Sequence, residues 1–173
     1  AAGASIRANT PYGIRWTVRV KTAEWNKLVK TYGEANVKAG VIIAPLDYLG
    51  SGETAVPFTI DAFKVANKKY VDIVTDTFNA NLENEVEGYS GFYASLVNIK
   101  AGNLNRKFIA RSYVAVTKDG VTSYYYGEYS AEDNARTIYE VGKGAIASDK
   151  ESENVKTFVK NEVLDKIADV TVK

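Results

Sequence analysis

Four closely spaced tyrosines are the side chains of this sequence best suited to contact a flat ligand. Three stand in succession and a fourth follows: Tyr124, Tyr125, Tyr126 and Tyr129. Because successive side chains of a β-strand point to opposite faces, Tyr124 and Tyr126 share a face that Tyr125 does not. An exposed tyrosine ring can stack on a sugar ring and donate a hydrogen bond beside the stack. Tyr124, Tyr126 and Tyr129 are therefore candidate contacts to a glycan or a protein partner, with core and cross-strand packing as the alternative.

A second group of chemically active side chains is acidic and lies in a loop expected over residues 79–88. Its carboxylates are Glu83, Glu85 and Glu87. Calcium in extracellular loops prefers such oxygen ligands, so these three side chains are candidate calcium ligands. The spacing does not match an EF-hand, and a solvated loop is the alternative.

Basic side chains are expected to form a stripe on one strand face. Residues 14–20 alternate between apolar and polar side chains, which places Arg15, Arg19 and Lys21 on the solvent side. A positive stripe could bind an anionic wall polymer or an acidic neighbour. The alternatives are a solvated face, or protection of the sheet against unwanted strand pairing.

The composition excludes several classes of function. The 173 residues include no Cys, Met or His, which excludes disulfides, zinc fingers, thiol catalysis and Ser-His-Asp hydrolysis. Twenty-two basic and 21 acidic residues give a net charge of +1, so we expect no nucleic-acid partner. No apolar run approaches the roughly 18 residues of a membrane span. Apart from possible calcium we expect no cofactor, and we expect that the protein is not an enzyme, because no pair of carboxylates stands out.

The elements that must position these groups are mostly strands. Alternating or β-branched patterns predict strands in seven places, at residues 5–8, 14–20, 37–44, 70–74, 91–99, 107–117 and 121–129. Asp119-Gly120 between the last two strands is a strong hairpin signal. The sequence therefore predicts an α+β protein with an antiparallel β-sheet or β-sandwich core, helices packed on one side and a C-terminal helix.

Three helices and one short helical segment accompany the strands. Apolar spacing and end signals predict helices over residues 22–33, 131–147 and 154–170, with one or two turns near residues 57–67 around Phe63 and Val65. The chain is expected to divide into a β-rich module at 1–147, and a linker with a C-terminal helix at 148–173. That helix is expected to pack on the same domain or to extend it.

Several stretches resemble a known family. Ala4-Ser5-Ile6-Arg7 before Tyr12-Gly13-Ile14-Arg15-Trp16, and Val41-Ile42-Ile43-Ala44-Pro45-Leu46-Asp47-Tyr48-Leu49, are similar to a recurrent uncharacterised extracellular module of Gram-positive (Firmicutes) secreted and cell-surface proteins. The resemblance covers about residues 3–147. It implies an exported, non-catalytic accessory module, located outside the cell or at its surface. The small residues at 1–4 are also typical of a signal-peptidase cleavage site, with a shortened chain as an equal alternative.

Two functions follow from these patterns. The first is a structural or surface module that assembles with copies of itself or with other surface proteins, into a filament or layer. Its assembly strand would be Ser5, Ile6, Arg7 and Ala8, added to the sheet edge of a neighbour. The alternative is a glycan-binding accessory module that contacts a polysaccharide through exposed tyrosines.

Overall fold

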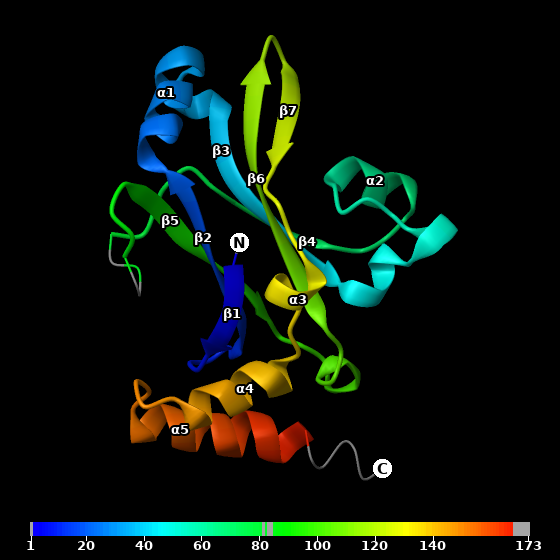
Figure 1. Cartoon of the computed structure of the whole chain (residues 1–173), viewed down its shortest axis with the longest axis vertical. Helices are drawn as coiled ribbons and strands as arrows, with labels where there is room; N and C mark the ends of the chain where they lie inside the picture. The colour runs from blue at the N-terminus through cyan, green and yellow to red at the C-terminus, as the bar shows by residue number, and fades with distance from the viewer. Residues whose placement is uncertain (1, 81, 83–84, 168–173) are drawn as a thin grey trace.

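The computed structural model describes residues 2–80, 82 and 85–167, which form two antiparallel sheets. The first sheet has the order β1-β2-β5, from Ala2–Arg7, Gly13–Lys21 and Tyr89–Val97. The second has the order β4-β3-β6-β7, from Val71–Thr75, Val37–Pro45, Phe108–Lys118 and Val121–Tyr126. In Figure 1 the strands of the first sheet lie to the left of β6 and β7.

Helices surround these sheets on several sides (Figure 1). They are α1 (Thr22–Tyr32), α2 (Ile60–Val65), α3 (Ala131–Asn134), α4 (Ile138–Ala147) and α5 (Glu153–Val159), and α5 continues through a π-helical turn at Lys160–Leu164. Short 3₁₀ turns lie at Glu34–Asn36, Leu46–Leu49, Gly52–Thr54 and Ala101–Asn103. The expected α+β class, with an antiparallel sheet core and a C-terminal helix, is confirmed.

The main core lies between the sheets and continues into the C-terminal helices. Alternation along β2 buries Ile14, Trp16 and Val18 against inner-face residues of β3 and β6, such as Val41. The indole Nε1 of Trp16 donates a 3.0 Å hydrogen bond to the Asn134 carbonyl oxygen, which ties the first sheet to α3. The same core includes six residues of the C-terminal helical region: Ile138, Val141, Ala145, Val159, Val163 and Ile167.

A second core covers the other face of the four-stranded sheet. Ile42 of β3 and Ile109 of β6 point to this face and pack against Phe58 and Phe63 in and before α2. The central strands β3 and β6 are therefore covered on both faces, whereas the edge strands β4 and β7 stay partly exposed. This explains why β3 is a nearly continuous apolar run, whereas β2 alternates between apolar and polar residues.

Several local expectations hold. The hairpin at Asp119-Gly120 joins β6 to β7 with positive φ at both residues, 50° and 78°. The first strand, expected at residues 5–8, spans Ala2–Arg7 and leaves Ala8 beyond its end. The last helix starts at Glu153, one residue before its expected start, and the end expected at residue 170 lies outside the described residues.

Three local predictions were wrong. The helix expected over residues 131–147 is broken, because Arg136 forms a β-bridge with Phe108 and Thr137 starts a new helix through a capping box with Glu140. β7 ends at Tyr126, so Tyr129 lies beyond the strand. Val65 in α2 is 90% exposed rather than packed, since the short helix buries only its other side.

Candidate functional site

The tyrosines expected to bind a glycan pack against the protein itself. Tyr124 and Tyr126 lie on the face of β7 that belongs to the second core, and their rings stack at 6.1 Å. The hydroxyl of Tyr126 accepts a 2.9 Å hydrogen bond from the backbone N–H of Ile60, at the start of α2. Burial raises the pKa of that hydroxyl. Both rings are half-buried, so their position favours the packing alternative.

Arg111 holds the outer side of this aromatic cluster. Its guanidinium carbon lies 4.9 Å from the ring centroid of Tyr126 and 4.7 Å from that of Tyr129. Arg111 Nε donates to the Gly127 carbonyl at 2.8 Å, and Nη1 donates to the Phe58 carbonyl at 3.0 Å. Arg111 thereby joins β7, the segment after it and the segment before α2. Glycan binding by these rings remains a prediction, and it would have to compete with these contacts.

Tyr125 is the exposed member of the group, at 63%. It points to the inner face of the four-stranded sheet, opposite Val114 in the register, and Val114 is in turn opposite Ala39. The first sheet has one strand fewer, and its residues do not cover the inner face of β7. Figure 1 shows the β6–β7 hairpin projecting beyond the first sheet.

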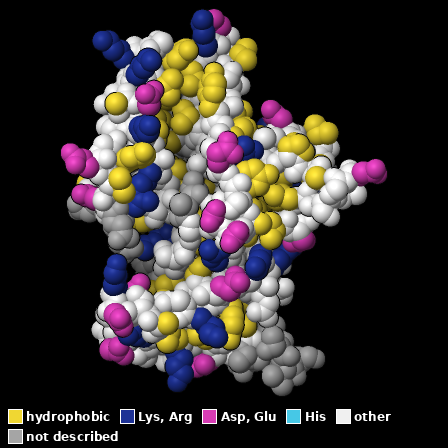
Figure 2. Space-filling view, viewed as in Figure 1, with side chains coloured by type: hydrophobic (Ala, Val, Ile, Leu, Met, Phe, Trp, Pro, Cys, Tyr) yellow, Lys and Arg dark blue, Asp and Glu magenta, His cyan; other side chains and the backbone are white. Residues whose placement is uncertain are grey.

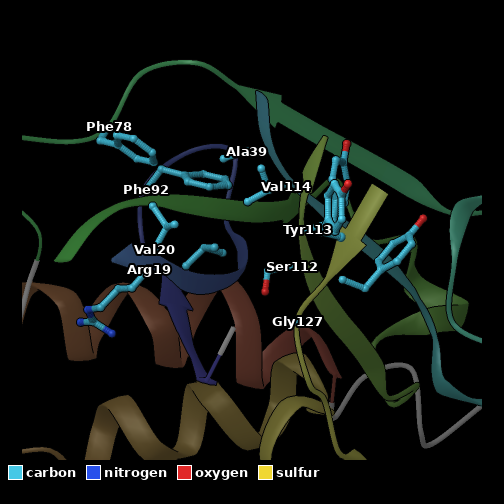
Figure 3. Close-up of a pocket in the computed structure, with 12 residues that line it drawn as sticks. Arg19, Val20, Ala39, Phe78, Phe92, Ser112, Tyr113, Val114 and Gly127 are labelled. Carbon is cyan, nitrogen blue, oxygen red and sulfur yellow. The ribbon is translucent and has the colours of Figure 1, made fainter. Parts of the chain in front are cut away.

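A pocket of about 230 Å³ lies at this margin, between the two sheets. Its walls include Val18 and Phe92 from the first sheet, and Ser112, Val114 and Tyr125 from the second. Figure 3 shows the Phe92 ring beside Ala39 and Val114, with Phe78 next to it. The pocket is open to solvent on one side and mostly apolar inside.

The outer edge of β1 borders a second hollowed region. A hollow of about 360 Å³ lies between residues 4–6 and α4, and another of about 430 Å³ lies between Gly3 and α3. Arg136 lines both hollows, and both adjoin β1 at residues 3–6. We call these two hollows together, bounded by residues 3–6, α3, Arg136 and α4, the β1 groove.

The β1 groove is acidic. Its lining includes four carboxylates: Glu128, Asp133, Glu140 and Glu151. Among the described lining residues Arg136 is the one basic side chain, and its Nη1 donates to the carbonyls of Glu132 and Ala135. Figure 2 shows acidic side chains gathered over α3 on the viewed face.

The four residues expected to form an assembly strand have different environments. Ile6 is buried in the main core, and Ser5 Oγ accepts a 3.3 Å hydrogen bond from Arg15 Nε. Arg7 Nε donates to the Pro11 carbonyl at 2.9 Å, and Ala8 lies after the strand. Their strand pairs with β2 of the same chain, and it forms one edge of its sheet.

The opposite edge of that sheet is partly covered. The backbone N–H of Asn79 donates to the Gly91 carbonyl at 2.9 Å, and its side-chain oxygen accepts from the Tyr93 N–H at 3.2 Å. These bonds satisfy backbone groups on the outer side of β5, which would otherwise be open to another strand.

The expected basic stripe is divided by local contacts. The guanidinium of Arg15 lies 4.4 Å from the ring centroid of Tyr93. Arg19 lines a hollow together with Glu85 and Glu87, two of the expected calcium ligands. Lys21 is exposed at the end of β2.

The calcium prediction is left open. Glu83, the third expected ligand, lies outside the described residues, and within the described part of the chain no three acidic side chains are grouped as a metal site. Elsewhere, both carboxylate oxygens of Asp47 accept hydrogen bonds from Arg106, at 2.7 and 2.6 Å. This pairing lowers the pKa of Asp47.

The sequence spacing put Tyr124 and Tyr126 on the same strand face, but it identified neither the pocket beside Tyr125 nor the β1 groove. The pocket draws residues from five strands, and the β1 groove combines β1 with residues about 130 positions later.

In the described part of the chain, no helix is both long and apolar enough to cross a membrane. Comparisons with family models, with curated proteins and with solved structures gave no match.

Proposed function

We propose that this protein is a non-catalytic structural or surface module that assembles with further copies of itself through the β1 groove. A segment of a second copy would lie along β1 and extend the three-stranded sheet by one strand. The observation that carries this proposal is the position of β1 as a sheet edge next to an open groove. Strand addition of this kind uses main-chain hydrogen bonds for affinity and the flanking surface for specificity.

The space beside β1 supports this assignment. A Cβ atom built at Gly3, or at Gly144 on the facing side of α4, would meet no atom within 4 Å. Both glycines therefore leave room next to the strand edge. The covered outer edge of β5 has no such space, because the segment around Asn79 already bonds there.

Charge and an open sheet edge indicate which segment of a second copy would enter the β1 groove. Glu140 is already paired with Lys107 at 3.6 Å, and the other three carboxylates along the groove favour a segment with a basic side chain. The other open sheet edge is β4, which carries Asp72 and no basic residue of its own, so the basic group would be the exposed Lys69 just before it. Val71 and Val74 of β4 are also exposed, as they would be if this strand met a partner. Pairing β1 of one copy with β4 of the next is head-to-tail and can continue as a filament.

Two substitutions at one position test the proposal. Gly144→Gln fills the groove, whereas Gly144→Ala adds a single methyl group, and both improve helix propensity. Sedimentation velocity should show self-association of the wild type and Gly144→Ala, with at least tenfold weaker association of Gly144→Gln. Equal association of all three proteins would contradict assembly through the β1 groove.

The charge component has its own test. Lys69→Glu places a negative charge on the segment that should enter the acidic groove, so association should weaken, and it should weaken less at high salt. An unchanged association constant would exclude β4 as the entering segment.

An extracellular or cell-surface location forms part of the proposal, supported by the sequence resemblance. Fractionation of the source cells tests it.

A further inference from the structure

We propose that the pocket between the two sheets, beside Tyr125, is a binding site for one uncharged aromatic ring. The site is separate from the β1 groove and does not depend on assembly. Its walls are Val18, Val20 and Phe92 of the first sheet, and Ala39, Val114 and Tyr125 of the second.

The pocket exists because small side chains face large ones across the sheets. In the strand register Ala39 is opposite Val114, and Val114 is opposite Tyr125. In the next row Val41 is opposite Ser112, and the Gly127 N–H donates to the Ser112 carbonyl at 2.8 Å. Ala39 and Ser112 leave space where a close-packed sandwich would carry larger residues.

The volume selects the size of the ligand. A cavity of about 150 Å³ is large enough to bind benzene, so the roughly 230 Å³ here accommodates one six-membered ring with a substituent. Pockets for drug-sized molecules are larger, at about 300–1,000 Å³. The pocket therefore fits a single ring better than a fused or linked system.

The lining selects an aromatic ring. Phe92 and Phe78 lie with their centroids 6.5 Å apart, and Phe78 also packs edge-on against Trp25 at 4.9 Å. A further ring between Phe92 and Tyr125 would extend this aromatic series through edge-to-face contacts. The exposed ring of Tyr125 stands at the mouth and would lose solvent contact on binding.

The electrostatics favour an uncharged ring. Arg19 is the charged residue among the described lining residues, and Figure 3 shows its guanidinium extending away from Ser112 and Gly127. Arg19 also lines the separate hollow that contains Glu85 and Glu87. A ligand charge in the pocket would thus lack a compensating group inside it.

The ring could belong to a free small molecule or to an aromatic side chain of another protein. Titration with p-cresol tests the first source, and titration with N-acetyl-phenylalaninamide tests the second. Methyl NMR of the full chain is the readout, because Val18, Val20 and Val114 line the pocket, whereas Val159 and Val163 of the C-terminal helical region are outside its lining. Glucose serves as a non-aromatic ring of similar size.

The proposal expects saturable shifts of the pocket methyls with at least one aromatic probe, and no comparable shifts of the Val159 and Val163 methyls. Ala39→Leu fills the pocket and should weaken binding at least tenfold. Tyr125→Ala alters an exposed side chain without threatening the fold and should weaken binding several-fold. Val121→Ala, exposed on the same strand and outside the lining, should leave binding unchanged.

Three results would overturn the proposal. The first is the absence of saturable shifts with both aromatic probes. The second is equal binding to the wild type, Ala39→Leu and Tyr125→Ala. The third is stronger binding of glucose than of p-cresol and the blocked amino acid, which would indicate a sugar site instead.

Discussion

Removal of the Arg111 side chain should destabilise the fold strongly, because its guanidinium connects three separate segments. It lies against the rings of Tyr126 and Tyr129 and donates to the carbonyls of Gly127 and Phe58. Arg111→Ala removes all four contacts together. If the tyrosines form a structural cluster that depends on Arg111, the substitution should lower the free energy of unfolding.

The magnitude follows from these contacts. A hydrogen bond from a charged donor contributes about 1.5–3 kcal/mol, and each cation–π contact about 0.5–1 kcal/mol at a partly exposed site. Allowing for solvent replacing part of what is lost, Arg111→Ala should lower the free energy of unfolding by about 3–5 kcal/mol. Arg111→Lys keeps the charge but lacks the planar fork, so it should lose about half of that.

Urea unfolding followed by circular dichroism measures this difference. Arg106→Ala is the matched control, because Arg106 also makes two hydrogen bonds and a cation–π contact, but with the exposed Asp47 and with Tyr48. Exposed ion pairs contribute about 0–1 kcal/mol. Equal losses for Arg111→Ala and Arg106→Ala, or a loss below about 1 kcal/mol for Arg111→Ala, would refute the structural role of the cluster.

Two further predictions concern a glycine and a helix cap. Gly40→Ala should destabilise by about 3 kcal/mol, because the new Cβ would lie 2.1 Å from Cζ of the buried Tyr113 and displace it from its hydrogen bond with Asp72; chemical unfolding measures it. The pKa of Glu140 is lowered by the Thr137 N–H, so the charged form contributes stability above its ordinary pKa of 4.5 and loses it as the pH falls through the lowered value. The stability difference between wild type and Glu140→Gln should therefore shrink from pH 6 to pH 3.

Each of these predictions has a control. Gly144→Ala is the match for Gly40→Ala, since its Cβ meets open space and the helix gains propensity, so stability should rise slightly. Equal destabilisation by both alanines would contradict the packing described for Tyr113. For Glu140, a stability difference that does not vary with pH would show that the cap acts without its charge.

Local pattern predicted those elements whose side chains face one environment. β2 alternates cleanly because only one of its faces is in the main core, and Asp119-Gly120 fixed the hairpin because both residues adopt positive φ. β3 was also predictable, since burial on both faces requires an apolar run. For these strands the local sequence and the tertiary environment agree.

Long-range contacts decided the features that local pattern missed. The break at Arg136 comes from its bridge with Phe108, nearly 30 residues earlier; the Thr137–Glu140 capping box is a local signal for the new helix, but nothing local marks the pairing. That Tyr124 and Tyr126 share one strand face was predictable. The burial of this face was not, because α2 and Arg111, which are distant in sequence, cover it.

The candidate sites depend on the same kind of contact. The pocket beside Tyr125 arises because one sheet has four strands and the other three, and because Ala39 and Ser112 come together across strands. The β1 groove needs α4 to lie opposite the first strand. Neither arrangement leaves a periodic signal in the sequence.

Assembly through the β1 groove can be observed by light scattering and negative-stain electron microscopy of the wild-type protein. We expect particles heavier than the 18.9 kDa chain that grow with concentration into linear arrays, and that disappear in Gly144→Gln but persist in Gly144→Ala. A monomer of 18.9 kDa at every concentration, or arrays that Gly144→Gln leaves intact, would contradict it.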